Sequence, residues 1–300
     1  MTSPLSDPGP APNHRNNWLR RYLTVQSAFD KDLDKILYEA AQDAEKALAE
    51  VKGDTVSAQV QRIQYNLAQR TIRKTIHELF GDTATLIRNH RQDAAVAAVD
   101  AEINDEKRIL EAIFPDKDSR EDYKASLRAT ARRNVEATIA RVYLSERPLS
   151  KRVYKTEALS NGFVRRAINS GLARGASAKD IAKMVSSSIR PDVPGGVAYA
   201  AKRLGRTELN NAFHAQAIVE TEDKPWVNYV EWHLSKVHEK DDCLCEVYAK
   251  QKRFEKRSVP VKPHPNCRCY IVPVMVPWVE FENNLLIGIY DSYLKTHLAA

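Results

Sequence analysis

The stretch WLRRYLTVQSAFDKDLDKILYEA, residues 18–40, decides the fold class of this chain. Its large apolar residues recur every three or four positions, at Trp18, Tyr22, Val25, Phe29, Leu33, Ile36, Leu37 and Ala40. That spacing gathers them into one stripe along an α-helix and leaves charged residues on the opposite face. The stretch therefore predicts a long amphipathic helix with one buried face.

The helical pattern extends outward from this stretch to about residue 149. Alanine is frequent there, and no glycine occurs between Gly81 and Gly162. We expect a first helix ending at Gly53, a second over about 56–80 that Gly81-Asp82 breaks, and a third ending at Phe114. A fourth begins at a cap, Asp118 or Ser119, and runs to Arg147 before Pro148. The second helix is expected to bury Ile63, Leu67, Ile72 and Ile76.

Beyond residue 149 the pattern changes to shorter helices and strands. We expect a short helix ending at Gly171, a helix capped by Ser177, a loop over 191–196, a helix over 197–222 and a strand over 227–232. Residues 259–276 are rich in proline and β-branched residues and predict a loop followed by a strand. One last helix is expected to use an apolar face made of Phe281, Leu285, Leu286, Ile289, Tyr290, Tyr293 and Leu294.

These expectations define an α+β fold that is predominantly α. A disordered arm over residues 1–15, containing proline, serine and glycine, precedes an extended helical region over residues 16–149. A small α+β module covers residues 150–277 and contains a zinc-knuckle-like cluster of cysteine and histidine. A helical tail over residues 278–300 ends the chain.

All four cysteines of the chain lie in two pairs, Cys243-Leu244-Cys245 and Cys267-Arg268-Cys269, and His264 shortly precedes the second pair in the run HPNCRC. Thiolates and imidazoles are the ligands of structural zinc sites, and a spacer of this length is usual between ligand pairs. The sequence therefore offers five candidates for about four positions on a Zn²⁺ ion: Cys243, Cys245, His264, Cys267 and Cys269. His238 is a weaker sixth.

Two other states of these cysteines stay open at this point. They can be reduced thiols without a metal, or they can form disulfides. Disulfides need an oxidising compartment, and the start of the chain, MTSPLSDPGPAPNHR, lacks the apolar core of a signal peptide. Zinc binding is the interpretation that accounts for the clustering of all four cysteines.

The net charge of +7 favours anionic surroundings but does not define a nucleic-acid site. One alternative is a sequence-independent DNA-binding protein, which would contact the phosphates of double-stranded DNA through Arg128, Arg132, Arg133, Lys252, Arg253, Lys256 and Arg257. The opposing interpretation places the arginines of the fourth helix on a solvated face. No apolar run approaches the roughly 20 residues that a membrane span requires, so no membrane partner is expected.

Several motifs between about residues 155 and 275 resemble one known family. They are Gly-Leu-Ala-Arg-Gly at 171–175, Arg206-Thr207-Glu208 opening into Asn211 and Ala212, Trp232 with Asp241-Asp242-Cys243-Leu244-Cys245, and HPNCRC at 264–269. Together they resemble the phage Mu F-like minor head proteins, also called phage head morphogenesis proteins. HPNCRC after a Cys-x-Cys pair is the most specific element, although many members have Cys-x-x-Cys at the first pair.

The resemblance implies a component of the virion. Such proteins join the procapsid in few copies, associate with the portal protein and capsid components, and support head assembly, DNA packaging or DNA delivery. The expected location is the capsid interior at the portal vertex, with the host cytoplasm as the location during assembly. A host-acting zinc-binding adaptor without a virion role is a further alternative.

An enzyme is the alternative of a different class. Arg206 and Glu208 resemble pieces of an ADP-ribosyltransferase site, and His238 with Asp241, Asp242 and Cys243 resembles a catalytic cysteine site. Residues two apart on a helix point to different faces, so Arg206 and Glu208 are not expected to share a site. No set of nucleophile, base and oxyanion donor stands out in the sequence, and we expect no enzymatic activity.

Overall fold

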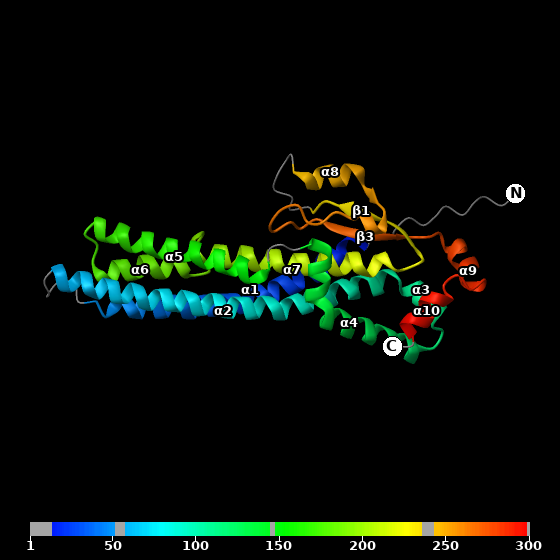
Figure 1. Ribbon diagram of the computed structural model, residues 1–300, viewed down its shortest axis with the longest axis horizontal. Coiled ribbons are helices and arrows are strands. Elements are labelled where there is room, and N and C mark those ends of the chain that lie inside the picture. The colour runs from blue at the N-terminus through cyan, green and yellow to red at the C-terminus, as the bar shows by residue number, and fades with distance from the viewer. Residues whose placement is uncertain (1–13, 52–57, 145–147, 236–242, 299–300) are drawn as a thin grey trace. The chain divides into compact units, whose positions relative to one another are not determined.

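The structure of the chain, a computed structural model, describes residues 14–51, 58–144, 148–235 and 243–298 (Figure 1). α-Helix dominates these residues, and three short strands form an antiparallel sheet in the last third of the chain. The fold is therefore α+β and predominantly α, as the sequence predicted. Among the helices of these residues, none combines the length and the apolar character that crossing a membrane requires.

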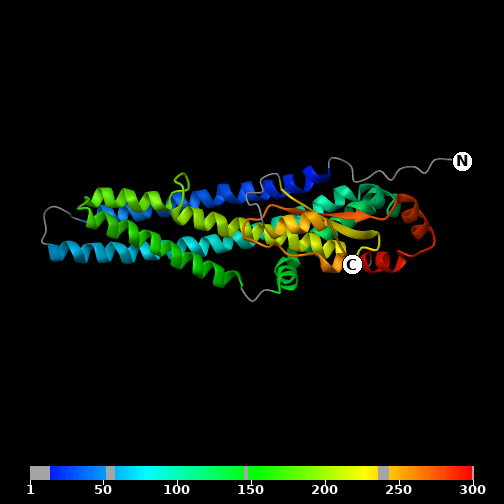
Figure 2. The same ribbon diagram turned by 90° about the horizontal axis from the view of Figure 1, so that it is seen from above.

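The first part of the chain is helical and contains α1 (His14–Ala49), α2 (Ala58–Asp105), α3 (Lys107–Ile113), α4 (Lys117–Tyr143), α5 (Leu149–Ala173), α6 (Ala178–Ile189) and α7 (Gly196–Glu222). The remainder alternates strands with shorter helices: β1 (Val227–His233), α8 (Leu244–Gln251), β2 (Arg253–Phe254), a 3-10 helix η1 (Lys256–Ser258), β3 (Tyr270–Met275), α9 (Trp278–Leu286) and α10 (Asp291–Leu298). Figure 2 shows the same elements from a second direction.

The chain divides into two compact units, each assembled from separate segments. Unit 1 contains Met1–Val25, His90–Ser145 and Leu209–Ala300, and unit 2 contains Gln26–Asn89 and Glu146–Glu208. Boundaries between these segments fall inside α1, α2 and α7, so each of these helices contributes residues to both units. A compact unit in this protein is therefore not a continuous stretch of sequence.

The apolar stripe predicted for the first helix lies on the buried side of α1. Trp18, Phe29, Leu33 and Leu37 are completely buried, and Val25 and Ile36 at the edge of the stripe are half-buried. The helix begins at His14, inside the segment predicted as an arm, and residues 1–13 lie outside the described residues. Gly53, its expected end, also lies outside them.

The predicted break at Gly81-Asp82 is wrong, because α2 runs through it without interruption. One glycine costs a helix only about 1 kcal/mol relative to alanine, and Leu79, Phe80 and Thr83 around it are buried and hold the segment in place. The actual interruption is the single residue Glu106 between α2 and α3.

Two of the four residues predicted to face inward on α2 are exposed. Ile72 and Ile76 are completely buried, but Ile63 and Leu67 are 53% and 55% exposed. Tyr65 and Ala68 hold the buried positions in this part of the helix. The buried stripe therefore steps through 65, 68, 72 and 76, and Ile63 and Leu67 lie out of phase with it.

Helix α4 begins earlier than either cap predicted for it. The side chain of Asp116 accepts a hydrogen bond from the backbone N–H of Ser119 at 2.7 Å. This contact satisfies one of the free N–H groups at the start of a helix, so Asp116 is the N-cap in place of Asp118 or Ser119. The end predicted at Arg147 lies outside the described residues, and α4 ends at Tyr143.

Helix α5 is one helix of 25 residues, where the sequence predicted only a short helix ending at Gly171. Gly171 instead lies inside α5, where a Cβ atom would approach Ile181 Cγ1 to 2.5 Å. Glycine at this position therefore allows α5 and α6 to pack closely. The predicted cap of α6 is confirmed, because Ser177 accepts from the backbone N–H of Asp180.

The sheet has the order β2-β1-β3, and both pairings are antiparallel. Trp232 of β1 pairs with Ile271 of β3, and Val230 pairs with Phe254 of β2. The strand predicted over 227–232 and the loop followed by a strand over 259–276 are both found. Since β3 follows directly after Cys269, its pairing with β1 fixes where the second cysteine pair lies.

The C-terminal segment forms two helices where one was predicted, because the chain turns at Gly288 with a positive φ of 76°. Phe281 and Tyr290 are buried in a cluster around Trp226 that also contains Ile109, Val227 and Val276. Leu286 and Ile289, predicted on the same apolar face, are 84% and 54% exposed because they flank the turn. This cluster belongs to unit 1.

Candidate metal centre

The first cysteine pair is positioned by the start of α8. Cys243 is the N-cap residue of this helix and has an extended backbone, and Cys245 lies in its first turn. Cys245 is completely buried, whereas Cys243 is half-buried. The change from extended to helical backbone between the two residues directs both sulfur atoms to the same imidazole, that of His264.

The second pair and His264 are positioned by a tight turn before β3. Asn266 has a positive φ of 57°, a conformation that asparagine adopts more readily than most residues. The turn returns the chain toward α8, so that Cys267 and Cys269, both buried, follow His264 at close range. The backbone N–H of Cys269 donates to the sulfur of Cys267, a contact that stabilises a thiolate.

The five predicted ligands meet in one place, with Cys245 at the centre. Its Sγ atom lies 3.4 Å from His264 Nε2 and 3.4 Å from Cys267 Sγ, and Cys243 Sγ lies 4.0 Å from the same nitrogen. Two groups of three donors result, Cys243 with Cys245 and His264, and Cys245 with Cys267 and Cys269. Within each group all donor atoms lie within 4.8 Å of one another.

These separations fit the donor atoms of a tetrahedral metal ion. With metal–sulfur bonds of about 2.3 Å and metal–nitrogen bonds of about 2.0–2.1 Å, adjacent donors lie about 3.6–3.8 Å apart. His264 Nδ1 lies 3.0 Å from the carbonyl oxygen of Pro265. A proton on Nδ1 that donates to this carbonyl leaves the lone pair on Nε2, the nitrogen that faces the sulfurs, as in many metal-binding histidines. The cluster can therefore hold a metal ion.

The close packing of sulfur atoms separates the pKa values of the buried thiols. Hydrogen bonds from Cys245 and Cys269 hold the pKa of Cys267 far below its usual range. The hydrogen bond to Cys267, with burial, raises the pKa of Cys245 well above the usual range. For Cys269, a hydrogen bond with Cys245 lowers the pKa, but the contact with Cys267 and burial raise it to about 11. A cation among these sulfurs would replace the shared protons and satisfy several thiolates at once.

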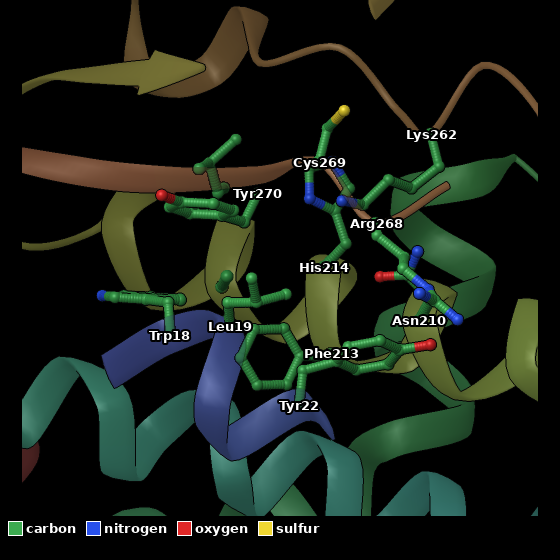
Figure 3. A pocket seen from close by; sticks show the side chains of 12 residues that line it. Trp18, Leu19, Tyr22, Asn210, Phe213, His214, Lys262, Arg268, Cys269 and Tyr270 are labelled. Carbon is green, nitrogen blue, oxygen red and sulfur yellow. The ribbon is translucent and has the colours of Figure 1, made fainter. Parts of the chain in front are cut away.

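Aromatic residues of α1 and α7 support the start of β3 below the cluster (Figure 3). Trp18 and Tyr22 each contact Phe213 edge-to-face with ring centroids 5.8 Å apart. The cavity among these residues has a volume of about 10 Å³, which admits no more than one water molecule. The sulfur of Cys269 points away from it, so this cavity is a gap in the packing and not a ligand pocket.

His214 of α7 lies in the same region but has a structural role. Its Nε2 atom lies 2.9 Å from the carbonyl oxygen of Pro260, and its ring contacts Trp232 edge-to-face at 5.5 Å. Complete burial lowers the pKa of His214 to about 3, so the imidazole is neutral and donates its Nε2 proton to Pro260. This contact anchors the loop that leads to His264.

The Arg206-Thr207-Glu208 motif forms two separate ion pairs within unit 2. The guanidinium of Arg206 donates to both carboxylate oxygens of Asp30 on α1 at distances of 2.8–3.2 Å. Glu208 is completely buried, and Arg152 of α5 donates to it at 2.8 Å. The motif therefore links α7 to two different helices.

Most of the basic residues considered for DNA contacts already have acceptors within unit 1. Arg128 pairs with Asp100 at 2.7 Å and Arg132 pairs with Asp93 at 3.0 Å. Lys252 and Arg253 lie 3.3 Å and 3.7 Å from the carboxylate of Glu231. The remaining contacts are those of Arg133 with Thr130 and of Lys256 with the carbonyl oxygen of Lys224, and the side chain of Arg257 is exposed.

His238, Asp241 and Asp242, considered above as a weaker ligand and as parts of a catalytic cysteine site, lie outside the described residues. The fold and the cluster define a predominantly helical protein with a partly buried cysteine–histidine site that can hold a metal ion. No protein-family model, curated protein or solved structure matches the chain.

Proposed function

We propose that the cluster binds one structural zinc ion through Cys245 and three of its four neighbours, Cys243, His264, Cys267 and Cys269. Thiolate and imidazole donors together suit zinc better than the harder cations, which prefer oxygen ligands. Three of the four cysteines are buried, and five donors leave no open position of the kind a catalytic zinc requires. Zinc here would tie the start of α8 to the turn before β3.

Metal analysis of the purified full chain tests this proposal. We expect about one zinc per chain, and we expect that few of the four thiols react with a thiol reagent until a chelator is added. A preparation without metal whose four thiols all react in the native state would rule out the zinc site.

We further propose that the protein is a phage minor head protein that acts by binding. The observation that carries this proposal is that the two most specific motifs, the Cys-x-Cys pair at 243–245 and HPNCRC at 264–269, meet in one cluster. Other residues of the same resemblance also have defined structural roles: Gly171 allows close packing with Ile181, and Arg206 pairs with Asp30. These positions in the fold support the proposal, because each of these motif residues has a defined contact within its own unit.

In this proposal the protein resides in the capsid interior at the portal vertex, after assembly in the host cytoplasm. Its partners are the portal protein and capsid components, and its role is in procapsid assembly, DNA packaging or DNA delivery. Long helices with charged outer faces suit repeated contacts with partner proteins, and the zinc site would keep the small α+β part folded.

Mass spectrometry of purified procapsids and virions, with the copy number measured relative to the portal protein, tests the virion role. Tagged protein from infected cells should capture portal and procapsid components, and a null mutant should give heads defective in packaging or DNA delivery. Absence from both procapsids and virions would contradict the proposal and favour the host-acting zinc-binding adaptor.

A further inference from the structure

Unit 2 contains a polar recess between α2 and α5, far in sequence from the cysteine cluster. Gln69 and Arg73 of α2 line one side of it, and Asn161 and Arg165 of α5 line the other. Its volume is about 110 Å³, well above the roughly 10–15 Å³ needed for one water molecule. The recess is therefore large enough for a small polar group.

The arrangement of these four side chains follows from the antiparallel packing of the two helices. His77 of α2 and Glu157 of α5 are in contact, with Nδ1 3.1 Å from Oε1. One helical turn from this pair lie Arg73 and Asn161, and a further turn away lie Gln69 and Arg165. Residues four apart share a helix face, so each helix supplies one carboxamide and one guanidinium to the recess.

Small side chains leave the space open. Ala158 and Gly162 of α5 are also four residues apart and line the same recess. A Cβ atom at Gly162 would meet nothing closer than the end of the Arg166 side chain at 3.4 Å. The glycine is therefore not required for helix packing, unlike Gly171 further along the same helix.

Neither guanidinium of the recess has an acceptor in the described part of the chain. Other basic residues of unit 2 do: Arg152 pairs with Glu208, Lys202 with Asp34, and Arg206 with Asp30. Glu157, one turn from the recess on α5, contacts His77. Two guanidinium groups therefore face a shared space without a counter-ion.

Other residues of the same unit add positive charge around the recess. Residues 148–208 contain twelve lysines and arginines against four aspartates and glutamates. Arg70 and Lys155, on the same two helices, have exposed side chains. A ligand in the recess would therefore meet a positive field as well as directed hydrogen-bond donors.

We propose that this recess binds a phosphate group. Guanidinium forks match the geometry of phosphate oxygens, and the amides of Gln69 and Asn161 add donors of their own. Two sources share this chemistry, a free phosphate ion and the backbone of a nucleic acid. The inference rests on the recess alone and does not depend on the virion role or on the zinc site.

Two double substitutions in the full chain distinguish binding in the recess from a general effect of positive charge. The double variant Arg73→Gln/Arg165→Gln removes both guanidinium groups from the recess. All four arginines of the two double variants are exposed, and the matched control, Arg88→Gln/Arg174→Gln, removes the same charge from positions on α2 and at the end of α5 that do not line the recess. A third variant, Ala158→Leu, fills the space while both recess arginines remain and keeps a residue that favours helix.

Binding is measured with inorganic phosphate by calorimetry at constant ionic strength, and with a short DNA duplex by fluorescence anisotropy over a range of salt concentrations. If the ligand is a free ion, the wild-type chain binds phosphate, and the recess double variant and Ala158→Leu lose this binding. If the ligand is a backbone, the slope of log K against log salt falls by about 2 in the recess double variant, and its DNA affinity falls equally for all sequences.

In either case the control pair must change binding much less than the recess pair. The proposal is overturned if the wild-type chain binds neither probe, or if both pairs weaken binding equally. It is also overturned if Ala158→Leu leaves phosphate and DNA binding unchanged. Circular dichroism spectra that match the wild type would show that each variant is folded.

Discussion

Cys245 is the residue on which the cysteine cluster depends most. It belongs to both groups of three donors, while Cys243 belongs to only one and is half-buried. Cys245→Ser breaks both groups and should therefore abolish zinc binding, whereas Cys243→Ser should retain a substantial part of it because the group of Cys245, Cys267 and Cys269 stays intact with His264 beside Cys245. The measurement is zinc content after dialysis against a weak chelator. Equal zinc loss in the two variants would contradict the central position of Cys245.

His214 makes stability depend on pH in a defined direction. Burial lowers its pKa to about 3 from an ordinary value of 6.5. Below pH 6.5 the unfolded chain takes up a proton on His214 that the buried imidazole of the folded state resists. The contribution of His214 to the free energy of unfolding is therefore complete above pH 6.5 and is lost as the pH falls from 6.5 toward 3. The expected loss is about 1.4 kcal/mol for each pH unit in this window.

Urea unfolding of wild type and His214→Phe between pH 7 and pH 5 measures this contribution. The variant should be less stable at pH 7, by about 1–3 kcal/mol, because the carbonyl of Pro260 loses its donor. Its stability should fall less steeply with acid than that of wild type. If the free energies of unfolding of wild type and His214→Phe changed equally with pH, His214 would not be buried in the neutral form.

Helical glycines of this chain have opposite roles, which the structure distinguishes and the sequence does not. A Cβ atom at Gly205 of α7 would lie 2.0 Å from Phe29, whereas one at Gly81 of α2 would meet nothing within 4 Å. Gly205→Ala should destabilise the protein by about 1–3 kcal/mol through overpacking. Gly81→Ala should stabilise it by about 0.5–1 kcal/mol through helix propensity. Thermal unfolding of the two variants compares them directly, and a stabilising Gly205→Ala would refute the close approach to Phe29.

Some features of these helices can be predicted from the sequence and others cannot. The stripe from Trp18 to Leu37 and the cap at Ser177 were predictable because both depend on local spacing. The helix ends predicted at Gly81 and Gly171 are wrong because a glycine inside a helix is recognised only from its tertiary neighbours. The five candidate ligands were predictable from their clustering, but the shared position of Cys245 was not.

The recess between α2 and α5 is not predicted by the sequence, for a related reason. Gln69 with Arg73, and Asn161 with Arg165, are pairs spaced four residues apart that can be seen in the sequence. Nothing local indicates that the two pairs face each other, because that depends on the packing of α2 against α5. Spacing alone therefore identifies each half of the recess but not the site.

The junction of α2 and α3 with the end of α7 holds a buried charge cluster in unit 1. Lys224 lies 3.1 Å from Glu102 and 2.7 Å from Glu106, and Trp226 donates to Glu106 at 2.8 Å. Burial raises the pKa of Glu102 well above its usual value. For Lys224, burial favours the neutral form, but the carboxylates of Glu102 and Glu106 outweigh it and raise its pKa.

Removing only the cation from this cluster should be costly. Lys224→Met leaves two buried carboxyl groups without their counter-ion, so we expect a loss of about 3–5 kcal/mol in chemical denaturation. Replacing the carboxylates as well, with Glu102→Leu and Glu106→Gln, should recover most of that loss, since the amide oxygen introduced at position 106 can still accept from Trp226. If Lys224→Met alone lowered the free energy of unfolding no more than the triple variant does, the charges of Lys224, Glu102 and Glu106 would not be coupled.

In the whole molecule, the division into two compact units predicts which segments lose stability when the metal is removed from the proposed zinc site. The site joins α8 to the segment before β3, and β3 pairs with the central strand β1. All of these elements belong to unit 1, whereas unit 2 has buried residues of its own, including Phe29, Leu33 and Ile181. A structural metal contributes its binding energy to the elements that it joins.

Hydrogen exchange followed by mass spectrometry, with and without a chelator, measures this effect segment by segment. Chelation should accelerate exchange in β1, α8 and β3, since opening of a cooperative unit exposes its amides together. Exchange in α5 and α6 should remain close to that of the metal-bound protein. Cys245→Ser should reproduce the chelated pattern without added chelator, which separates loss of the ion from other effects of the reagent. Equal acceleration in β3 and in α6 would show that a metal in the cysteine–histidine cluster stabilises the entire chain, and the two units would then unfold as one.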